Sequence, residues 1–487
     1  MIEVLSIASE VFPLVKTGGL ADVAGALPRA LAPFGVSMRT LIPGYPSVAG
    51  RLESGRVVAE LLDYFGGPAR LIAGRTEGLD IIVLEAPHLF DRPGNPYLDP
   101  TGVDWPDNWQ RFAALSFAAY ELGRGLVEGY HPQILHSHDW QAGLVPAYVA
   151  FNAPIRVKTV ITVHNLAFQG IFGWDIFPAL RLDHRAADEG AIEFFGSISF
   201  LKAGLQCADA ITTVSPTYAH EIRTSAYGVG LEGLLRTRSE VLHGILNGID
   251  TSDWNPGADP ALPQSYGAST THLRAVNKAA LAEAFGLEPG PGPLFGVVSR
   301  LTWQKGMDML VETADELVER GGRLAVLGSG QSELENALMG AAMRHPGKVG
   351  VITKYDERLS HLVQGGADVM VVPSRFEPCG LTQLYGLRYG CVPLVSRVGG
   401  LADTLIDANE AAVEAGVATG IVFSPATQEA LAEAIRRAIG LFGREKVWRK
   451  MQRRGMKSEV SWEASAEKYA DLYSNLLGLK RDDDQDD

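Results

Sequence analysis

Short apolar runs alternate with helix-like segments along the second half of the chain, a pattern that few folds accommodate. Segments of helical period, such as residues 307–320 and 429–442, separate six runs rich in Val and Ile, at residues 294–299, 323–328, 349–353, 368–373, 392–396 and 420–424. Strands that are apolar throughout are typical of a parallel sheet covered by helices on both faces. Because crossovers between parallel strands are right-handed, the pattern predicts an α/β fold with a doubly wound sheet.

The first half repeats this pattern less regularly. Residues 108–128 are expected to form a long helix, and strands are predicted at residues 2–8, 36–42, 81–85, 134–137, 159–163 and 210–214. A Pro- and Gly-rich stretch that opens at Asn255-Pro256-Gly257 indicates a nearby domain boundary. We therefore predict two doubly wound domains, at residues 1–250 and 251–460, then an amphipathic helix at 461–480 and a solvated acidic tail at 481–487.

Charge and cysteine content exclude several classes of protein. The 487 residues include 43 basic and 57 acidic side chains, which give a net charge of −14. An acidic chain without a concentrated basic patch repels nucleic acid and anionic membranes, so neither is expected as a partner. Three cysteines cannot form a disulfide framework and indicate a reducing compartment. With no signal-peptide features and no apolar run of about 18 residues, we expect a soluble, cytoplasmic protein.

Two loops that follow predicted strands carry residues suited to phosphate. In the first half, Lys16 precedes Gly18 and Gly19, and a helix is predicted to follow. Paired glycines let the backbone approach a ligand at a helix end, although such a pair is more often a simple turn. In the second half, Arg300 and Lys305 lie between a strand and a helix, where a diphosphate is well held. Two solvated surface charges are the alternative.

A turn at residues 374–383 adds a candidate carboxylate. Glu377 lies on this turn and Gly380 is predicted to open a helix, so the carboxylate could bind sugar hydroxyls while backbone amides face a phosphate. Gly328 and Gly330 match the first two glycines of a dinucleotide-binding fingerprint. The third glycine is missing, because Glu333 occupies its position. An NAD-dependent oxidoreductase is therefore disfavoured.

Three histidines end predicted strands in the first half. His136 and His138 are predicted to point to opposite faces of their strand, which argues against a shared metal site. His164 ends a fully apolar strand, and a purely structural histidine there is as plausible as a functional one. Asp139 could be no more than the N-cap of a following helix.

Several blocks of residues together resemble the bacterial glycogen synthases, which share a retaining glycosyltransferase family with plant starch synthases. The resemblance runs from Met1 to about Leu477. It rests on the blocks Lys16-Thr-Gly-Gly-Leu-Ala-Asp-Val, His138-Asp-Trp-Gln, Thr162-Val-His-Asn, Asn247-Gly-Ile-Asp, Ser299-Arg-Leu-Thr-Trp-Gln-Lys-Gly and Arg375-Phe-Glu-Pro-Cys-Gly-Leu-Thr-Gln-Leu. It implies a GT-B fold, in which two Rossmann-like domains face each other across a deep cleft and the C-terminal helix crosses back to the N-terminal domain.

The resemblance also implies an activity and a set of site residues. The expected reaction transfers glucose from ADP-glucose to the non-reducing-end 4-hydroxyl of an α-1,4-glucan such as glycogen, with retention at C1 and without a metal or other cofactor. The implied catalytic residues are His164, Glu377, Asp139, Asn247, Arg300 and Lys305, with the last two holding the diphosphate. The implied substrate-binding residues are Lys16, Gly18, Gly19, Asp22, Tyr97, Tyr355 (stacked on adenine), Gly380, Leu381 and Thr382.

One position departs from the pattern of the wider group of retaining GT-B glycosyltransferases, which have two glutamates with seven residues between them. Tyr385 stands there, as in the glycogen synthase branch, so no ribose carboxylate is predicted. UDP-glucose as donor, another glucan as acceptor, and a non-catalytic glucan-binding protein remain alternatives at this stage.

Overall fold

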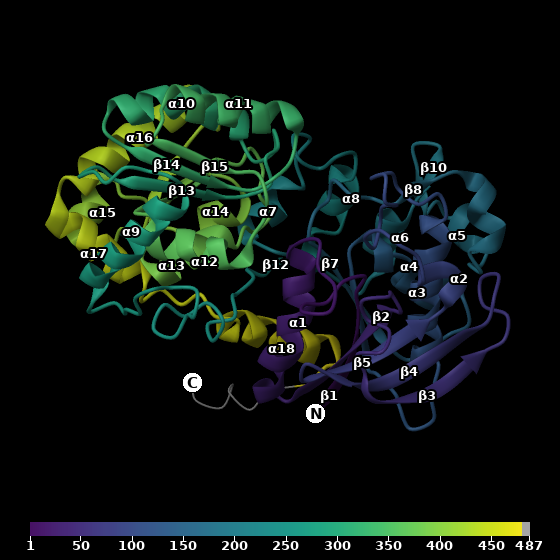
Figure 1. Cartoon of the computed structure of the whole chain (residues 1–487). Coiled ribbons are helices and arrows are strands. Elements are labelled where there is room, and N and C mark those ends of the chain that lie inside the picture. The colour runs from purple at the N-terminus through teal and green to yellow at the C-terminus, as the bar shows by residue number, and fades with distance from the viewer. Residues whose placement is uncertain (480–487) are drawn as a thin grey trace. The chain divides into compact units, whose positions relative to one another are not determined.

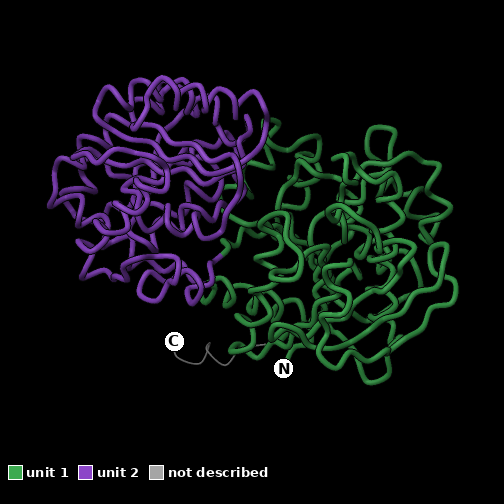
Figure 2. The backbone as a smooth tube through the Cα atoms, in the orientation of Figure 1, with its two compact units in different colours: residues 1–247, 462–487 green, residues 248–461 purple. Residues whose placement is uncertain are grey.

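The computed structural model describes residues 1–479 and divides the chain into two compact units (Figure 2). Unit 1 comprises residues 1–247 together with the C-terminal segment from Trp462, and unit 2 comprises residues 248–461. The acidic tail predicted at 481–487, and the last residue of the helix predicted at 461–480, lie outside the described residues. No helix within residues 1–479 is long and apolar enough to cross a membrane.

Unit 2 is built on a six-stranded sheet that is parallel throughout, in the order β15-β14-β13-β16-β17-β18. Its strands are β13 (Leu294–Val298), β14 (Arg323–Leu327), β15 (Val349–Ile352), β16 (Val369–Val372), β17 (Val392–Ser396) and β18 (Ile421–Phe423). Each lies within a run predicted to be a strand, so the doubly wound sheet is confirmed. The strand order reverses between β13 and β16, and ligands of such sheets bind at the carboxyl ends beside this switch point.

Helices cover both faces of this sheet. In Figure 1, α10 and α11 lie over one face and α12 and α13 over the other. The predicted helices at 307–320 and 429–442 are confirmed as α10 and α16. The bounds are α9 (Arg274–Ala284), α10 (Met307–Glu319), α11 (Ser332–Arg344), α12 (Glu357–Gly366), α13 (Thr382–Tyr389), α14 (Gly399–Thr404), α15 (Glu410–Ala415), α16 (Gln428–Phe442) and α17 (Glu445–Gly455).

Unit 1 contains a nine-stranded sheet in the order β12-β11-β7-β6-β1-β2-β5-β4-β3. The six predicted strands are confirmed as β1 (Ile2–Ile7), β2 (Val36–Pro43), β5 (Leu79–Glu85), β6 (Ile134–His138), β7 (Lys158–Val163) and β11 (Ala210–Thr213). They are all parallel, and the switch point lies between β1 and β6. The prediction missed an antiparallel edge hairpin, β3 (Glu53–Leu61) and β4 (Ala69–Thr76), and the short strand β12 (Leu242–Gly244).

In unit 1, helix α3 (Asn108–Gly123) is shorter than predicted, and helix α18 (Glu463–Leu476) packs on this unit although it follows unit 2 in the chain. Helix α3 stops five residues before the predicted end, because Gly123 and the left-handed Gly125 (φ +91°) close it. Helix α18 packs beside α1 (Gly19–Leu31) and buries Tyr469 and Tyr473 against the sheet. The C-terminal helix therefore belongs to unit 1, as the resemblance implied.

Unit 2 also encloses a polar cluster around His361 on α12. The Nδ1 atom of His361 lies 2.8 Å from Oδ2 of Asp259. The indole of Trp254 stacks between the rings of His361 and Tyr385, with centroid distances of 3.8 and 3.6 Å. Burial lowers the pKa of His361, but hydrogen bonds to Glu357 and Asp259 outweigh burial and raise the pKa above 6.5. The charged imidazole is therefore the form that this cluster stabilises.

This cluster predicts a stability that declines as pH rises. Because the pKa of His361 is higher in the folded than in the unfolded chain, its stabilising contribution is complete below pH 6.5 and is lost as pH rises through the folded value. We expect the Tm of the wild type to fall more between about pH 6 and about pH 9 than that of His361→Gln. The exposed substitution His131→Gln serves as the control. Parallel Tm curves for the wild type and His361→Gln, followed by scanning calorimetry, would contradict the assignment.

Candidate active site

The carboxyl ends of β13 and β16 enclose a small cavity of about 70 Å³ at the switch point of unit 2. Five residues predicted to act on substrate line it: Lys305, Glu377, Gly380, Leu381 and Thr382. The remaining wall comes from the ends of β13 and β16, the residues that follow these strands, and the first residue of α10, namely Val298, Ser299, Met307, Val371, Val372, Pro373 and Ser374. The structure thus brings together two motifs that lie about seventy residues apart in the sequence, at the place where such sheets bind ligands.

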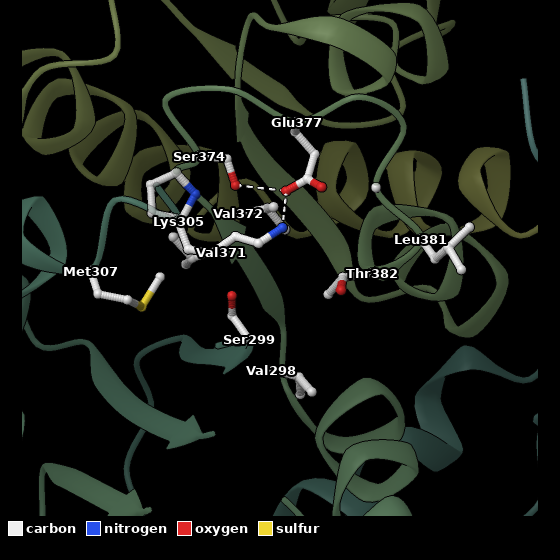
Figure 3. A pocket seen from close by; sticks show the side chains of 12 residues that line it. Val298, Ser299, Lys305, Met307, Val371, Val372, Ser374, Glu377, Leu381 and Thr382 are labelled. Atoms are coloured by element: carbon white, nitrogen blue, oxygen red, sulfur yellow. Dashed lines mark hydrogen bonds and ion pairs between the residues drawn. The ribbon is translucent and has the colours of Figure 1, made fainter. Parts of the chain in front are cut away.

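Lys305 and Glu377 form an ion pair in this cavity (Figure 3). The Lys305 ammonium and the Ser374 hydroxyl both donate to Oε2 of Glu377, the hydroxyl at 2.9 Å. The side chains of Lys305 and Glu377 are only 17% and 10% exposed, so water screens the pair little. The cavity therefore offers a cation suited to phosphate oxygens beside a carboxylate suited to hydroxyl groups.

Two glycines at the start of α14 leave room for the backbone of the Glu377 turn. A Cβ atom on Gly399, whose φ is +42°, would lie 1.9 Å from the carbonyl oxygen of Glu377. A Cβ atom on Gly400 would lie 2.4 Å from the carbonyl oxygen of Cys379. Real Cβ atoms cannot approach so closely, so only glycines at these positions allow the turn to pack on the start of α14.

Arg300 and Tyr355 lie at the same edge of the sheet but do not line this cavity. Arg300 follows β13 and is exposed, and its guanidinium has no hydrogen-bond or ion-pair partner within residues 1–479. Tyr355 follows β15, is 54% exposed, and donates its hydroxyl proton to Glu357. Both side chains are therefore accessible to a ligand, with β14 between the strands that carry them.

In unit 1 the Lys16 loop follows β1. Lys16 Nζ forms an ion pair with Asp22 Oδ1 at 2.8 Å. Gly18 precedes α1 and Gly19 is its first residue. A Cβ atom on either glycine would meet nothing within 4 Å, and neither glycine has a positive φ. Internal packing therefore does not require glycine here, and the space beside this backbone is open to a ligand.

Glu10 organises this loop and was not singled out in the sequence. Its carboxylate is 2% exposed and accepts hydrogen bonds from the amides of Thr17 and Gly18 and from the hydroxyls of Thr17 and Tyr97. Burial and the charge of Glu10 together hold the pKa of Tyr97 well above its usual range. Its position could have marked Glu10 as a candidate site residue, because it lies three residues after β1, at the carboxyl edge of the sheet.

Asp139 directly follows β6 and has a strained backbone conformation. Its φ of +54° is unusual for a residue with a side chain and often marks a functional position. The carboxylate is 8% exposed, and Oδ1 accepts the backbone N–H of His164 at 2.7 Å. It makes no N-cap hydrogen bond to the following turn, so the N-cap interpretation is wrong. Burial raises the pKa of Asp139 to about 7, against the lowering effect of backbone hydrogen bonds from His164 and Asn165.

The prediction that His136 and His138 face opposite sides of their strand is wrong. Their ring centroids lie 4.5 Å apart, because side chains two positions apart on a strand share a face. His164 continues the row, with its ring 5.2 Å from that of His138. Burial lowers the pKa of all three histidines, so each is neutral near pH 7. Within residues 1–479, no group of three His, Cys, Asp or Glu side chains is placed to hold a metal ion.

Asn247, the residue at which the chain passes from unit 1 into unit 2, is 8% exposed. Its Oδ1 atom is buried without a hydrogen-bond partner in the described part of the chain. A buried acceptor without a partner costs about 1–3 kcal/mol and calls for an explanation such as a bound group. This orphaned amide oxygen fits a residue that contacts substrate.

Comparison with known families identifies the class of enzyme. Residues 3–237 match the family described as starch synthase catalytic domain, and residues 282–454 match glycosyl transferases group 1. The catalytic domain of starch synthase IV from Arabidopsis thaliana, solved with ADP and acarbose, is similar with a TM-score of 0.88 and 30% identity, covering 98% of this chain and 99% of that one. Sucrose-phosphate synthase from Thermosynechococcus elongatus shares the fold, with a TM-score of 0.60 at 20% identity, over 98% of this chain and 100% of its own. Two Rossmann-like domains with these matches define a GT-B glycosyltransferase.

The relatives narrow the class further. The glycogen synthase of Rhizobium johnstonii is 55% identical over 475 residues, which cover 98% of this chain and 99% of the relative. Glycogen synthase 1 of Rhizobium meliloti is 56% identical over 475 residues, which cover 97% of this chain and 99% of that protein. The chain belongs to the family of bacterial glycogen synthases and starch synthases. The roles assigned to individual side chains stay predictions.

Proposed function

We propose that this protein transfers glucose from ADP-glucose to the non-reducing-end 4-hydroxyl of an α-1,4-glucan, and so elongates glycogen in the cytoplasm. The Lys305–Glu377 pair at the switch point of unit 2 carries the proposal, because it combines the groups needed for a sugar and for its diphosphate leaving group. The near full-length similarity to proteins named glycogen synthase supports the choice of acceptor. The ADP in the similar starch synthase structure supports the choice of nucleotide.

Stabilisation of the departing diphosphate is the main task of the site. In unit 2, Arg300 and Lys305 supply two cations, and helix α10 supplies N-terminal amides. Each charge-assisted hydrogen bond contributes about 1.5–3 kcal/mol, and each helix end about 0.3–1 kcal/mol. At about 1.4 kcal/mol per factor of ten, the two cations together account for a rate gain of roughly 10²–10⁴.

Retention of configuration follows from attack on the same face as the departing phosphate. In this step the bond from C1 to the phosphate oxygen breaks, the bond from C1 to the acceptor oxygen forms, and the hydroxyl proton passes to the departing phosphate. In unit 2, the proposed contact with the glucose is Glu377. In unit 1 it is His164, beside which Asp139 lies with a raised pKa. A covalent glucosyl–enzyme trapped on Glu377 or Asp139 would contradict this mechanism.

The proposed function is tested by incubating the purified protein with glycogen and radiolabelled ADP-glucose. We expect label to enter the glucan at α-1,4-linked ends, and much less to enter from equimolar UDP-glucose. Digestion of the product with an α-1,4-specific exo-glucosidase checks the linkage and the anomer. Absence of transfer from ADP-glucose, or preferred transfer from UDP-glucose, would contradict the proposal.

Metal chelation is expected to leave the activity unchanged. The charge on the diphosphate is met by Arg300, Lys305 and helix-end amides, so no divalent cation is needed for the leaving group. We expect the initial rate with excess EDTA to stay within about twofold of the untreated rate. The control is EDTA followed by excess Mg²⁺. A loss of more than about tenfold that Mg²⁺ restores would show that a metal takes part.

A further inference from the structure

A row of buried polar side chains crosses one face of the unit 1 sheet and ends at His164. Ser6 on β1, His136 and His138 on β6, and Thr162 on β7 share this face, because neighbouring strands are in register there. Helix α18 covers the far end of the row, where the Tyr473 hydroxyl lies 2.7 Å from Nδ1 of His136. All of these side chains except His164 are buried.

His138 has the central place in this row. Its Nδ1 lies 3.0 Å from Nε2 of His164, and its Nε2 lies 3.2 Å from the Ser6 hydroxyl. Within residues 1–479, the ring of His164 has no other hydrogen-bond partner. Asp139 contacts only the backbone N–H of His164, so it does not orient the ring. The Nδ1 atom of His164 is then the ring nitrogen left for a substrate.

A hydrogen bond between two neutral imidazoles couples their proton positions. If Nδ1 of His138 carries the proton, Nε2 of His164 must be bare and its proton is on Nδ1. If Nδ1 of His138 is bare, Nε2 of His164 carries the proton. Both rings therefore hold the same tautomer, since unlike tautomers would set two protons or two lone pairs against each other.

We propose that His138 is a positioning residue, which fixes the ring orientation and the tautomer of His164 and so decides whether the nitrogen facing the glucose donates or accepts a hydrogen bond. The importance of this for turnover rests on the proposed function, in which His164 holds the sugar. The ring contact itself does not depend on that function. Loss of contact with water, complete for His138 and partial for His164, lowers the pKa of both rings and keeps the pair neutral near pH 7.

The coupling is tested directly by NMR on the whole protein with ¹⁵N-labelled histidine, near pH 7 and without ligand. The ¹⁵N shifts separate bare from protonated ring nitrogens, and the variants His138→Asn and His164→Asn assign the two sets of signals. We expect the same tautomer on His138 and His164. Unlike tautomers, or a His164 ring that averages between tautomers, would overturn the proposal whatever the enzyme does.

Two variants of matched chemistry test the effect on turnover. An Asn amide can replace Nδ1 of His138 and keep the contact with His164, whereas a Gln amide extends to the Nε2 position and keeps only the Ser6 contact. We expect His138→Gln to lower kcat by about 10- to 100-fold, the scale known for loss of a group that orients a metal-binding histidine. We expect kcat of His138→Asn to be at least about fivefold higher than that of His138→Gln. The KM values for ADP-glucose and for glycogen should stay near those of the wild type.

Tyr473→Phe is the control for general loosening of the row, because it removes a buried hydroxyl at His136 and leaves the His138–His164 contact intact. It should lower the Tm and keep kcat within about twofold. Equal kcat values for the Asn and Gln variants, or a Gln variant as active as the wild type, would overturn the proposal. A wild type that transfers no glucose from ADP-glucose would instead remove the proposed function and leave the NMR result unaffected.

Discussion

Replacement of Lys305 by Ala is expected to lower kcat by roughly 10²–10³, the scale for losing one preorganised donor to a developing charge. The ammonium lies in the cavity with Glu377 and Ser374 and is only 17% exposed, so little water is present to take its place. The loss should appear in kcat more than in the KM for ADP-glucose, since the charge on the leaving oxygen grows towards the transition state. Steady-state kinetics with saturating glycogen measure both constants.

A second effect of Lys305→Ala must be separated from the first. The change strands the Glu377 carboxylate, which is 10% exposed, and a buried charge without its partner is destabilising. The double variant Lys305→Ala/Glu377→Gln removes that stranded charge. If Lys305 stabilises the leaving group, the double variant regains Tm but not kcat. A single variant within about threefold of the wild type, or a double variant that regains activity, would contradict the role.

Replacement of Asp139 by Asn is expected to stabilise the protein above neutral pH while it lowers activity. Burial raises the pKa of Asp139 from 3.8 to about 7. The folded chain therefore holds more protons than the unfolded chain between these values, and the stability of the wild type falls as pH rises through this window. The difference corresponds to about 4 kcal/mol at most. The Asn variant lacks this pH dependence and still offers an oxygen to the N–H of His164.

Denaturant unfolding of the wild type and Asp139→Asn at about pH 5 and about pH 8 measures the difference. We expect the variant to gain stability relative to the wild type at the higher pH. The exposed substitution Asp80→Asn should show no such dependence. We expect kcat of Asp139→Asn to fall by about 10- to 150-fold, because hydrogen bonds to a charged group contribute about 1.5–3 kcal/mol. A variant that loses stability at both pH values would refute the buried-charge account.

The sheet strands that sequence patterns predicted are those buried on both faces. β13 and β16, for example, carry no polar side chain, because helices cover both faces of the sheet. The hairpin β3–β4 was missed for the opposite reason. β3 is the edge strand and is largely exposed, and polar residues interrupt its alternation, as in Glu53-Ser54-Gly55-Arg56.

For the candidate site, the sequence located motifs at strand ends but not the contacts between them. Lys305 and Glu377 were singled out separately, yet their pairing depends on the turn that Gly399 and Gly400 allow. Glu10 was missed because a single carboxylate after a strand has no pattern of its own; only folding places it against Thr17, Gly18 and Tyr97. The prediction for His136 and His138 was wrong because it placed residues two positions apart on opposite faces of a strand. Side chains two positions apart lie on the same face.

The return of α18 to unit 1 has a consequence for biosynthesis. The chain enters unit 2 at Gly248 and leaves it at Ser461, and the two crossings lie side by side, with Ile249 N–H donating to the carbonyl of Val460 at 2.8 Å. Unit 2 is thus one continuous stretch, while unit 1 lacks Tyr469 and Tyr473 until α18, which follows unit 2 in the chain, has been translated. On the ribosome, unit 2 can therefore complete its interior before unit 1, which must wait until α18 has emerged.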